Sequence, residues 1–134
     1  MTTTVPMLDA YPGETVLDHD TLGLTIDRLL DCAEACTACA DACLGEDEVA
    51  DLTRCIRLNL DCADVCAATA RVLSRQTSSD DRLNLDLLQA CVAICQTCGD
   101  ECSRHADHHL HCRLCADACA EAEEACRELI AVLL

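Results

Sequence analysis

The stretch Cys32-Ala-Glu-Ala-Cys36-Thr-Ala-Cys39-Ala-Asp-Ala-Cys43 decides the fold of this chain. Its cysteines follow one another at steps of four, three and four residues, which is the spacing of one face of an α-helix. At about 100° per residue, the last three cysteines all project within about 40° of Cys32. A bundle helix normally fills so narrow a face with leucine, so the sequence predicts a helical bundle whose core contains sulfur.

The same spacing returns between Cys91 and Cys102, and two further stretches of helical pattern carry the remaining cysteines. These faces predict an all-α protein, an antiparallel up-down-up-down four-helix bundle with a cysteine-lined core. The expected metal-ligating cysteines are Cys32, Cys36, Cys39, Cys43, Cys55, Cys62, Cys66, Cys91, Cys95, Cys98, Cys102, Cys112, Cys115, Cys119 and Cys126.

Short polar segments divide the periodic pattern into four helices. The predicted helices span about residues 20–44, 47–74, 80–103 and 106–133. Residues 1–17 contain both prolines and no lasting period, so we expect an irregular N-terminal tail there and a single bundle domain over residues 18–134.

Antiparallel order gives the predicted bundle two unlike ends. Leu73, Leu88 and Ile130 fall at one end, whereas the predicted turns near Gly45 and His105 bring cysteines and histidines to the other. We expect metal to enter at the histidine-bearing end, with His105, His108 and His111 as further ligands. On a helix that starts at residue 106, His108 projects onto the cysteine face, His105 and His111 onto its margins, and His109 further aside.

Composition and charge limit the possible partners. The net charge is −16 at pH 7, and the basic side chains are all arginine, so the surface would repel nucleic acid and anionic lipid. The start of the chain lacks the pattern of a secretory signal, and no apolar run is long enough to span a membrane. We therefore expect a cytoplasmic protein whose thiols stay reduced, which favours metal ligation over disulfides.

Helix geometry also opposes disulfides within one cysteine face. Neighbouring Cβ atoms on a helix lie about 5 to 6 Å apart, whereas a disulfide needs about 3.8 Å. Structural zinc and iron–sulfur sites usually gather their thiolates on turns or loops, but the first cysteine face spreads its sulfurs over about 16 Å. Cu(I) accepts two or three thiolates and can share bridging sulfurs, so it suits such a row.

Charge gives a second reason to prefer Cu(I). Fifteen buried thiolates could not remain uncompensated, so the metal-free core should contain neutral thiols that pack as small apolar groups. Exchanging each proton for one monovalent ion keeps that core near neutral, whereas divalent ions at the same loading would leave about 15 excess positive charges.

These features together resemble the copper storage proteins, specifically their cytosolic branch. The resemblance covers about residues 20–133 and rests on the cysteine faces, the repeated Cys-x-x-x-Cys-x-x-Cys-x-x-x-Cys pattern and the histidines near the last predicted turn. It implies many Cu(I) ions per bundle, a homotetramer, a core role for all fifteen cysteines, and an entry role for His105, His108, His109 and His111. Asn59 and Ala122 stand where further cysteines could have been, so we expect fewer sites at those levels.

Other functions fit the sequence less well. A ferritin-like enzyme would need inward Glu-x-x-His pairs, which are absent, and a copper-sensing repressor would need a basic face. We therefore expect no enzyme but a protein that stores and sequesters Cu(I), with a copper chaperone as a further partner that gives or receives the metal. A zinc or mixed-metal thiol buffer or detoxification protein remains the alternative.

Overall fold

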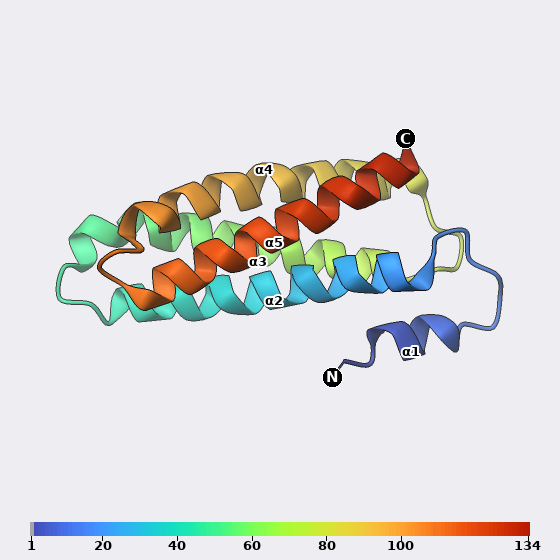
Figure 1. Cartoon of the computed structure of the whole chain (residues 1–134), viewed down its shortest axis with the longest axis horizontal. Coiled ribbons are helices and arrows are strands. Elements are labelled where there is room, and N and C mark those ends of the chain that lie inside the picture. Colours follow the sequence, from blue (N-terminus) through green and yellow to red (C-terminus); the bar gives the residue numbers. More distant parts are fainter. Residues whose placement is uncertain (1) are drawn as a thin grey trace.

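The four amphipathic stretches form four long helices, arranged as an antiparallel bundle in a computed structural model that describes residues 2–134 (Figure 1). The long helices are α2 (His19–Leu44), α3 (Thr53–Ser74), α4 (Asp81–His105) and α5 (Leu110–Leu133). Each long helix packs against the next along the chain, and α5 closes the bundle against α2. The described residues contain no strand, so the predicted all-α bundle is confirmed.

Side-chain caps fix where two of these helices begin. Asp18 accepts a hydrogen bond from the backbone N–H of Thr21 at 2.9 Å, at the start of α2. Asp80 accepts hydrogen bonds from the N–H groups of Arg82 and Leu83 at 2.9 and 3.1 Å, at the start of α4. Such caps stabilise a helix by about 1 kcal/mol because they satisfy N–H groups that have no partner within the helix.

The turns at one end of the bundle differ from the sequence prediction. A short 3-10 helix, η1 (Val49–Leu52), precedes α3, so the regular helix begins at Thr53 and not near residue 47. At the second turn, α4 continues to His105, and α5 begins at Leu110 and not at residue 106. The backbone of His109 is extended, with φ −137° and ψ 112°, which breaks the helix that the sequence pattern had suggested to be continuous. We call the two turns, residues 45–48 and 106–109, the histidine end.

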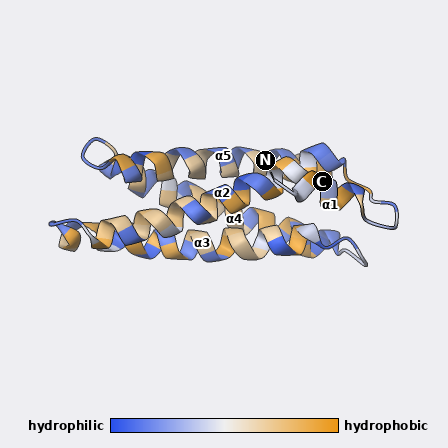
Figure 2. Cartoon of the chain, turned by 90° about the horizontal axis from the view of Figure 1, so that it is seen from below, coloured by the Kyte–Doolittle hydropathy of each residue, from blue (hydrophilic) through white to orange (hydrophobic). Residues whose placement is uncertain are grey.

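The N-terminal segment is more ordered than the irregular tail that the sequence predicted. It contains a short helix, α1 (Thr4–Asp9), which packs along α2 (Figures 1 and 2). Thr4 donates a hydrogen bond to Asp27 at 2.6 Å, and His19 Nδ1 lies 2.6 Å from Asp9 Oδ1. Gly23 has no side chain that would collide with Val5, which lets the two helices approach closely.

The core changes from hydrocarbon to sulfur along the bundle axis, as the sequence predicted. Leu22, Leu73, Leu88 and Leu129 are buried at the end opposite the two turns, and we call this the hydrocarbon end. Ile130, which the sequence placed there, is only partly buried, because the inward face of α5 passes through Ala122, Cys126 and Leu129.

Figure 2 shows apolar and polar residues alternating along each helix, as expected for helices that bury one face. Among residues 2–134, no helix has both the length and the apolar character required to cross a membrane.

Candidate metal centre

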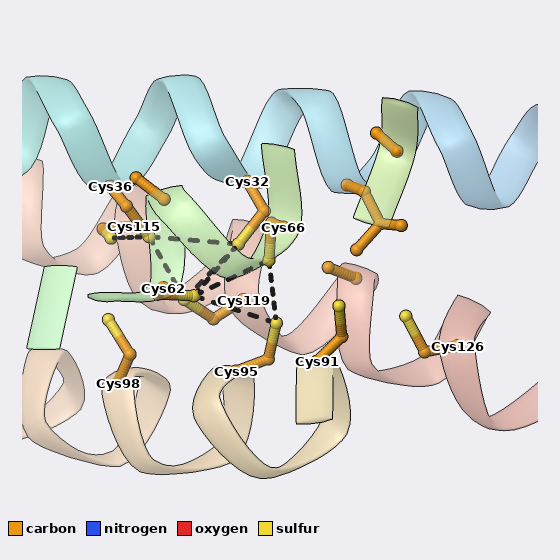
Figure 3. Packing of buried hydrophobic residues seen from close by; sticks show 14 of the residues in the cluster. Cys32, Cys36, Cys62, Cys66, Cys91, Cys95, Cys98, Cys115, Cys119 and Cys126 are labelled. Carbon is orange, nitrogen blue, oxygen red and sulfur yellow. Dashed lines mark hydrogen bonds between the residues drawn. The ribbon is translucent and has the colours of Figure 1, made fainter. Parts of the chain in front are cut away.

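All fifteen cysteines lie in the core with free thiols, and each is at most 1% exposed. They come from all four long helices, and the cysteines labelled in Figure 3 point into the space between these helices. The shared burial follows from the helical spacing that the sequence shows, because each cysteine face is the inward face of its helix. The structure therefore brings together every cysteine that the sequence predicted as a ligand.

The distances between sulfur atoms suit metal bridging. Cys66 and Cys95 lie 3.6 Å apart, Cys55 and Cys102 also 3.6 Å apart, and the Sγ atoms of Cys32 and Cys62 are 3.8 Å apart. A disulfide bond is much shorter, about 2.05 Å. Two thiolates that bind the same metal ion, each at about 2.3 Å, can be up to about 4.6 Å apart. Small adjustments would therefore let one ion bind two or three neighbouring sulfurs.

The thiols form overlapping groups in which all ligand atoms lie within 4.8 Å of one another. From the hydrocarbon end to the histidine end, these groups include Cys32, Cys62, Cys66 and Cys95; Cys32, Cys36, Cys62 and Cys119; Cys36, Cys98, Cys115 and Cys119; Cys39, Cys102 and Cys115; and Cys39, Cys43, Cys112 and His111. Each of these groups shares one or two thiols with the next group along the bundle, and shared thiols are what bridging sulfurs require. The core therefore offers a continuous row of soft ligands.

Cys91 and Cys126 extend this row toward the hydrocarbon end (Figure 3). Cys91 donates a hydrogen bond to Thr69 Oγ1 at 3.2 Å. Ala122, which the sequence identified as a gap in the cysteine face of α5, is fully buried between the levels of Cys119 and Cys126. It contributes packing and no ligand at this level.

Asn59 is fully buried among the thiols and is more than a gap in the cysteine face of α3. Its Oδ1 atom accepts hydrogen bonds from Cys98, Cys115 and Cys102 at 3.1, 3.3 and 3.4 Å. The position was visible in the sequence, but this contact with three thiols was not, because the cysteines come from two other helices. The amide supplies the polar partner that a buried cluster of S–H donors needs.

His111 is the histidine that contacts the thiol row. Its Nδ1 atom lies 3.3 Å from Cys39 Sγ and 3.6 Å from Cys112 Sγ, and its Nε2 atom lies 3.0 Å from Glu46 Oε2. His105 contacts a carboxylate instead, with Nε2 2.8 Å from Glu101 Oε2.

His108 is exposed in the turn before α5. The prediction that it lies on the cysteine face is wrong, because that projection assumed a helix that starts at residue 106. His109, which the sequence placed aside, is buried against Glu46 and Glu48, with contacts of 2.6 and 3.2 Å. The sequence shows that Glu46 and Glu48 follow α2 and could pair with a histidine. It does not show which histidine, because only the fold brings the two turns together.

Burial and hydrogen bonding shift the pKa values at the histidine end. Burial raises the pKa of the Cys43 and Cys112 thiols, which are therefore neutral near pH 7. A hydrogen bond with Cys102, assisted by His111, lowers the pKa of Cys39 to about 6. Burial alone would lower the pKa of His111, but hydrogen bonds with Cys39 and Glu46 outweigh it and raise that pKa. His111 therefore helps to stabilise the ionised form of the Cys39 thiol at this end.

Comparison with known proteins places this arrangement in a family. The model of the family described as copper storage protein, Csp, matches residues 18–131 of the chain. The match covers all four long helices except the last residues of α5.

Solved structures of copper storage proteins resemble the chain. The copper storage protein Ccsp from Streptomyces lividans, loaded with 10 copper equivalents, is 54% identical with a TM-score of 0.94, and the alignment covers 96% of this chain and 98% of that chain. A cytosolic copper storage protein from Streptomyces lividans with five coppers is 58% identical, with a TM-score of 0.82 and coverage of 84% and 93%. The Cu(I)-bound copper storage protein BsCsp3 is 37% identical, with a TM-score of 0.71. The alignment covers 79% of this chain and 94% of that chain.

Proposed function

Because the chain belongs to the copper storage protein family, we propose that its core cysteines store many Cu(I) ions inside a bundle that is already folded. The observation that carries this proposal is the continuous row of overlapping thiol groups, in which neighbouring groups share sulfurs. The copper-loaded relatives from Streptomyces lividans and the Cu(I)-bound BsCsp3 support it. The direct test is anaerobic titration of the reduced protein with Cu(I).

The metal-free core explains why a monovalent ion fits. Neutral thiols pack as small apolar groups, and replacing each S–H proton by one Cu(I) leaves the charge of the core almost unchanged. Chains of thiols 3.6 to 3.9 Å apart can then bridge successive ions without unfolding the helices.

We further propose a cytosolic location, which is the location described for the Streptomyces lividans relative. A storage role and not a catalytic one fits thiols that are all buried, since none is presented to a substrate. Assembly into a homotetramer, which the family resemblance implies, is a further proposal. Exchange of metal with a copper chaperone, as donor or acceptor, is another.

A zinc or mixed-metal thiol buffer is the second candidate, favoured by the groups of four cysteines whose sulfurs lie within 4.8 Å. Such groups could each hold one tetrahedral ion. However, neighbouring groups share thiols, so separate Zn(II) sites would compete for the same ligands. Comparing Cu(I) and Zn(II) capacities distinguishes the two functions.

Copper loading should release protons and become weaker in acid. Because burial keeps thiols such as Cys43 and Cys112 protonated, each Cu(I) that binds there must displace a proton. Below the pKa of the thiol, the affinity for each such ion should therefore fall about 10-fold for each pH unit by which the solution is made more acidic. Competition with a Cu(I) chelator at pH 8, 7 and 6 measures this dependence, after correction for the chelator's own protonation. An affinity that does not change over this range would contradict the proposed neutral core.

The histidines should affect the rate of loading more than its extent. We propose that His111, beside Cys39 and Cys112, receives Cu(I) and passes it to the thiols. Replacing His105, His108 and His111 together with alanine should slow transfer from a chelator by roughly 10-fold and change the capacity by no more than about two ions. The single variant His111→Ala should account for most of this effect in stopped-flow measurements.

The matched control is His108→Ala, since that side chain is exposed in the turn. Equal slowing in the two single variants would contradict the assignment to His111, and unchanged rates in the triple variant would show that copper enters elsewhere.

A further inference from the structure

Two histidines converge on one carboxylate oxygen at the histidine end, outside the thiol row. Glu46 Oε2 lies 2.6 Å from His109 Nδ1 and 3.0 Å from His111 Nε2. Glu46 belongs to the turn that follows α2, whereas the histidines lie at the start of α5. Their rings stack with centroids 5.4 Å apart. Residues far apart in the sequence therefore direct three polar atoms toward one small region.

The remaining ring nitrogens also have partners. His109 Nε2 lies 3.2 Å from Glu48 Oε1, and His111 Nδ1 lies 3.3 Å from Cys39 Sγ. Both nitrogens of His109 therefore face carboxylate oxygens, so the ring needs a cation or a second proton to satisfy both contacts. A carboxylate that accepts from the distal nitrogen is the usual support for a metal-binding histidine, because it fixes the tautomer and the ring orientation.

We propose that Glu46 Oε2, His109 Nδ1 and His111 Nε2 bind one divalent cation, with Glu48 and Cys39 orienting the two rings. Two imidazoles and one carboxylate form a donor set for divalent ions such as Fe(II), and it differs from the all-sulfur groups of the core. The side chains of Glu46 and His111 are 31% and 25% exposed, so water can complete the coordination. The two acidic residues also supply charge to balance the ion.

The proposal has a consequence for copper entry, which rests on the proposed function. A neutral imidazole has one lone pair. When His111 binds the divalent cation through Nε2, its Nδ1 carries the proton and can only donate to Cys39. When His111 binds Cu(I) through Nδ1, its Nε2 carries the proton and donates to Glu46. The cation and an entering Cu(I) therefore exclude each other at this ring.

Mn²⁺ is the appropriate probe, because it binds carboxylate and imidazole ligands and has little affinity for thiols. The signal of free Mn²⁺ in electron paramagnetic resonance, measured with reduced metal-free protein, should reveal about one bound ion per chain. Glu46→Gln and His109→Ala should each weaken binding by at least ~10-fold, the usual cost of losing a ligand or its support. Saturating the protein with Cu(I) should weaken Mn²⁺ binding by a similar factor, at least ~10-fold.

The matched control is His19→Ala, which removes a histidine that pairs with a single carboxylate, Asp9, near the hydrocarbon end. It should leave Mn²⁺ binding unchanged. No Mn²⁺ binding, equal weakening in this control, or full binding to the Cu(I)-saturated protein would overturn the proposal. Cu(I) capacity and helical circular dichroism of the same samples report separately on the storage function and on folding.

Discussion

Reduced, metal-free protein is expected to bind Cu(I) on the order of one ion per cysteine, and far fewer Zn(II) ions, because only the monovalent ion replaces a thiol proton without adding charge to the core. All fifteen cysteines are buried, so an uncompensated charge has no access to water. Thiols shared between neighbouring groups should allow the ions to bind as bridged clusters and not as isolated sites.

Anaerobic titration, followed by thiolate-to-copper absorption in the ultraviolet and by metal analysis after gel filtration, gives the capacity. Cys62→Ser provides a sharp variant, because Cys62 belongs to two overlapping groups, and it should lower the capacity by about two or more ions. Leu88→Ala, at the hydrocarbon end, serves as the control and should leave the capacity unchanged. Saturation of the parent protein at one or two ions would contradict multi-ion storage.

The sequence was sufficient to predict the bundle and its sulfur core because helical geometry converts spacing directly into position. Cys32, Cys36, Cys39 and Cys43 can share one face only on a helix, and that face must then be buried. The difference between the hydrocarbon end and the sulfur-lined end was also predictable, because antiparallel helices bring the leucine-bearing parts of their inward faces to the same end of the bundle. Both predictions depend on local periodicity and chain direction alone.

The histidines were harder to place because their positions depend on where a helix begins. His108 would face the thiols on a helix that starts at residue 106, but the extended backbone of His109 delays the start of α5 to Leu110. His109 in turn packs against Glu46 and Glu48, which lie more than 60 residues earlier in the sequence. Sequence periodicity carries no information about such a contact between two turns.

The N-terminal helix was missed for a related reason. A helix as short as α1 is not stable by its own propensity, and its order depends on contacts with α2, including the hydrogen bond from Thr4 to Asp27. The space left by Gly23 for Val5 is equally invisible in a sequence pattern.

The reduced, metal-free protein is expected to be helical and cooperatively folded, since neutral thiols pack as apolar groups. Within that fold, Leu88→Ala and Leu129→Ala should each lower the free energy of unfolding by about 2 to 5 kcal/mol. Both leucines are 0% exposed at the hydrocarbon end, so shortening them leaves a cavity that surrounding helices can fill only in part. Urea unfolding of reduced protein, followed by circular dichroism, measures the change.

Leu60→Ala is the control, because that leucine lies on α3 with 48% of its surface exposed, and it should change the free energy of unfolding by less than about 0.5 kcal/mol. The side chains of Leu88 and Leu129 offer no atom that binds a metal, so the leucine variants should load the same amount of copper as the parent once folded. A disordered spectrum for the reduced, metal-free parent would contradict the prediction, because copper would then have to fold the chain as it binds. Equal losses in the Leu60 and Leu88 variants would show instead that burial at the hydrocarbon end is not what stabilises the empty bundle.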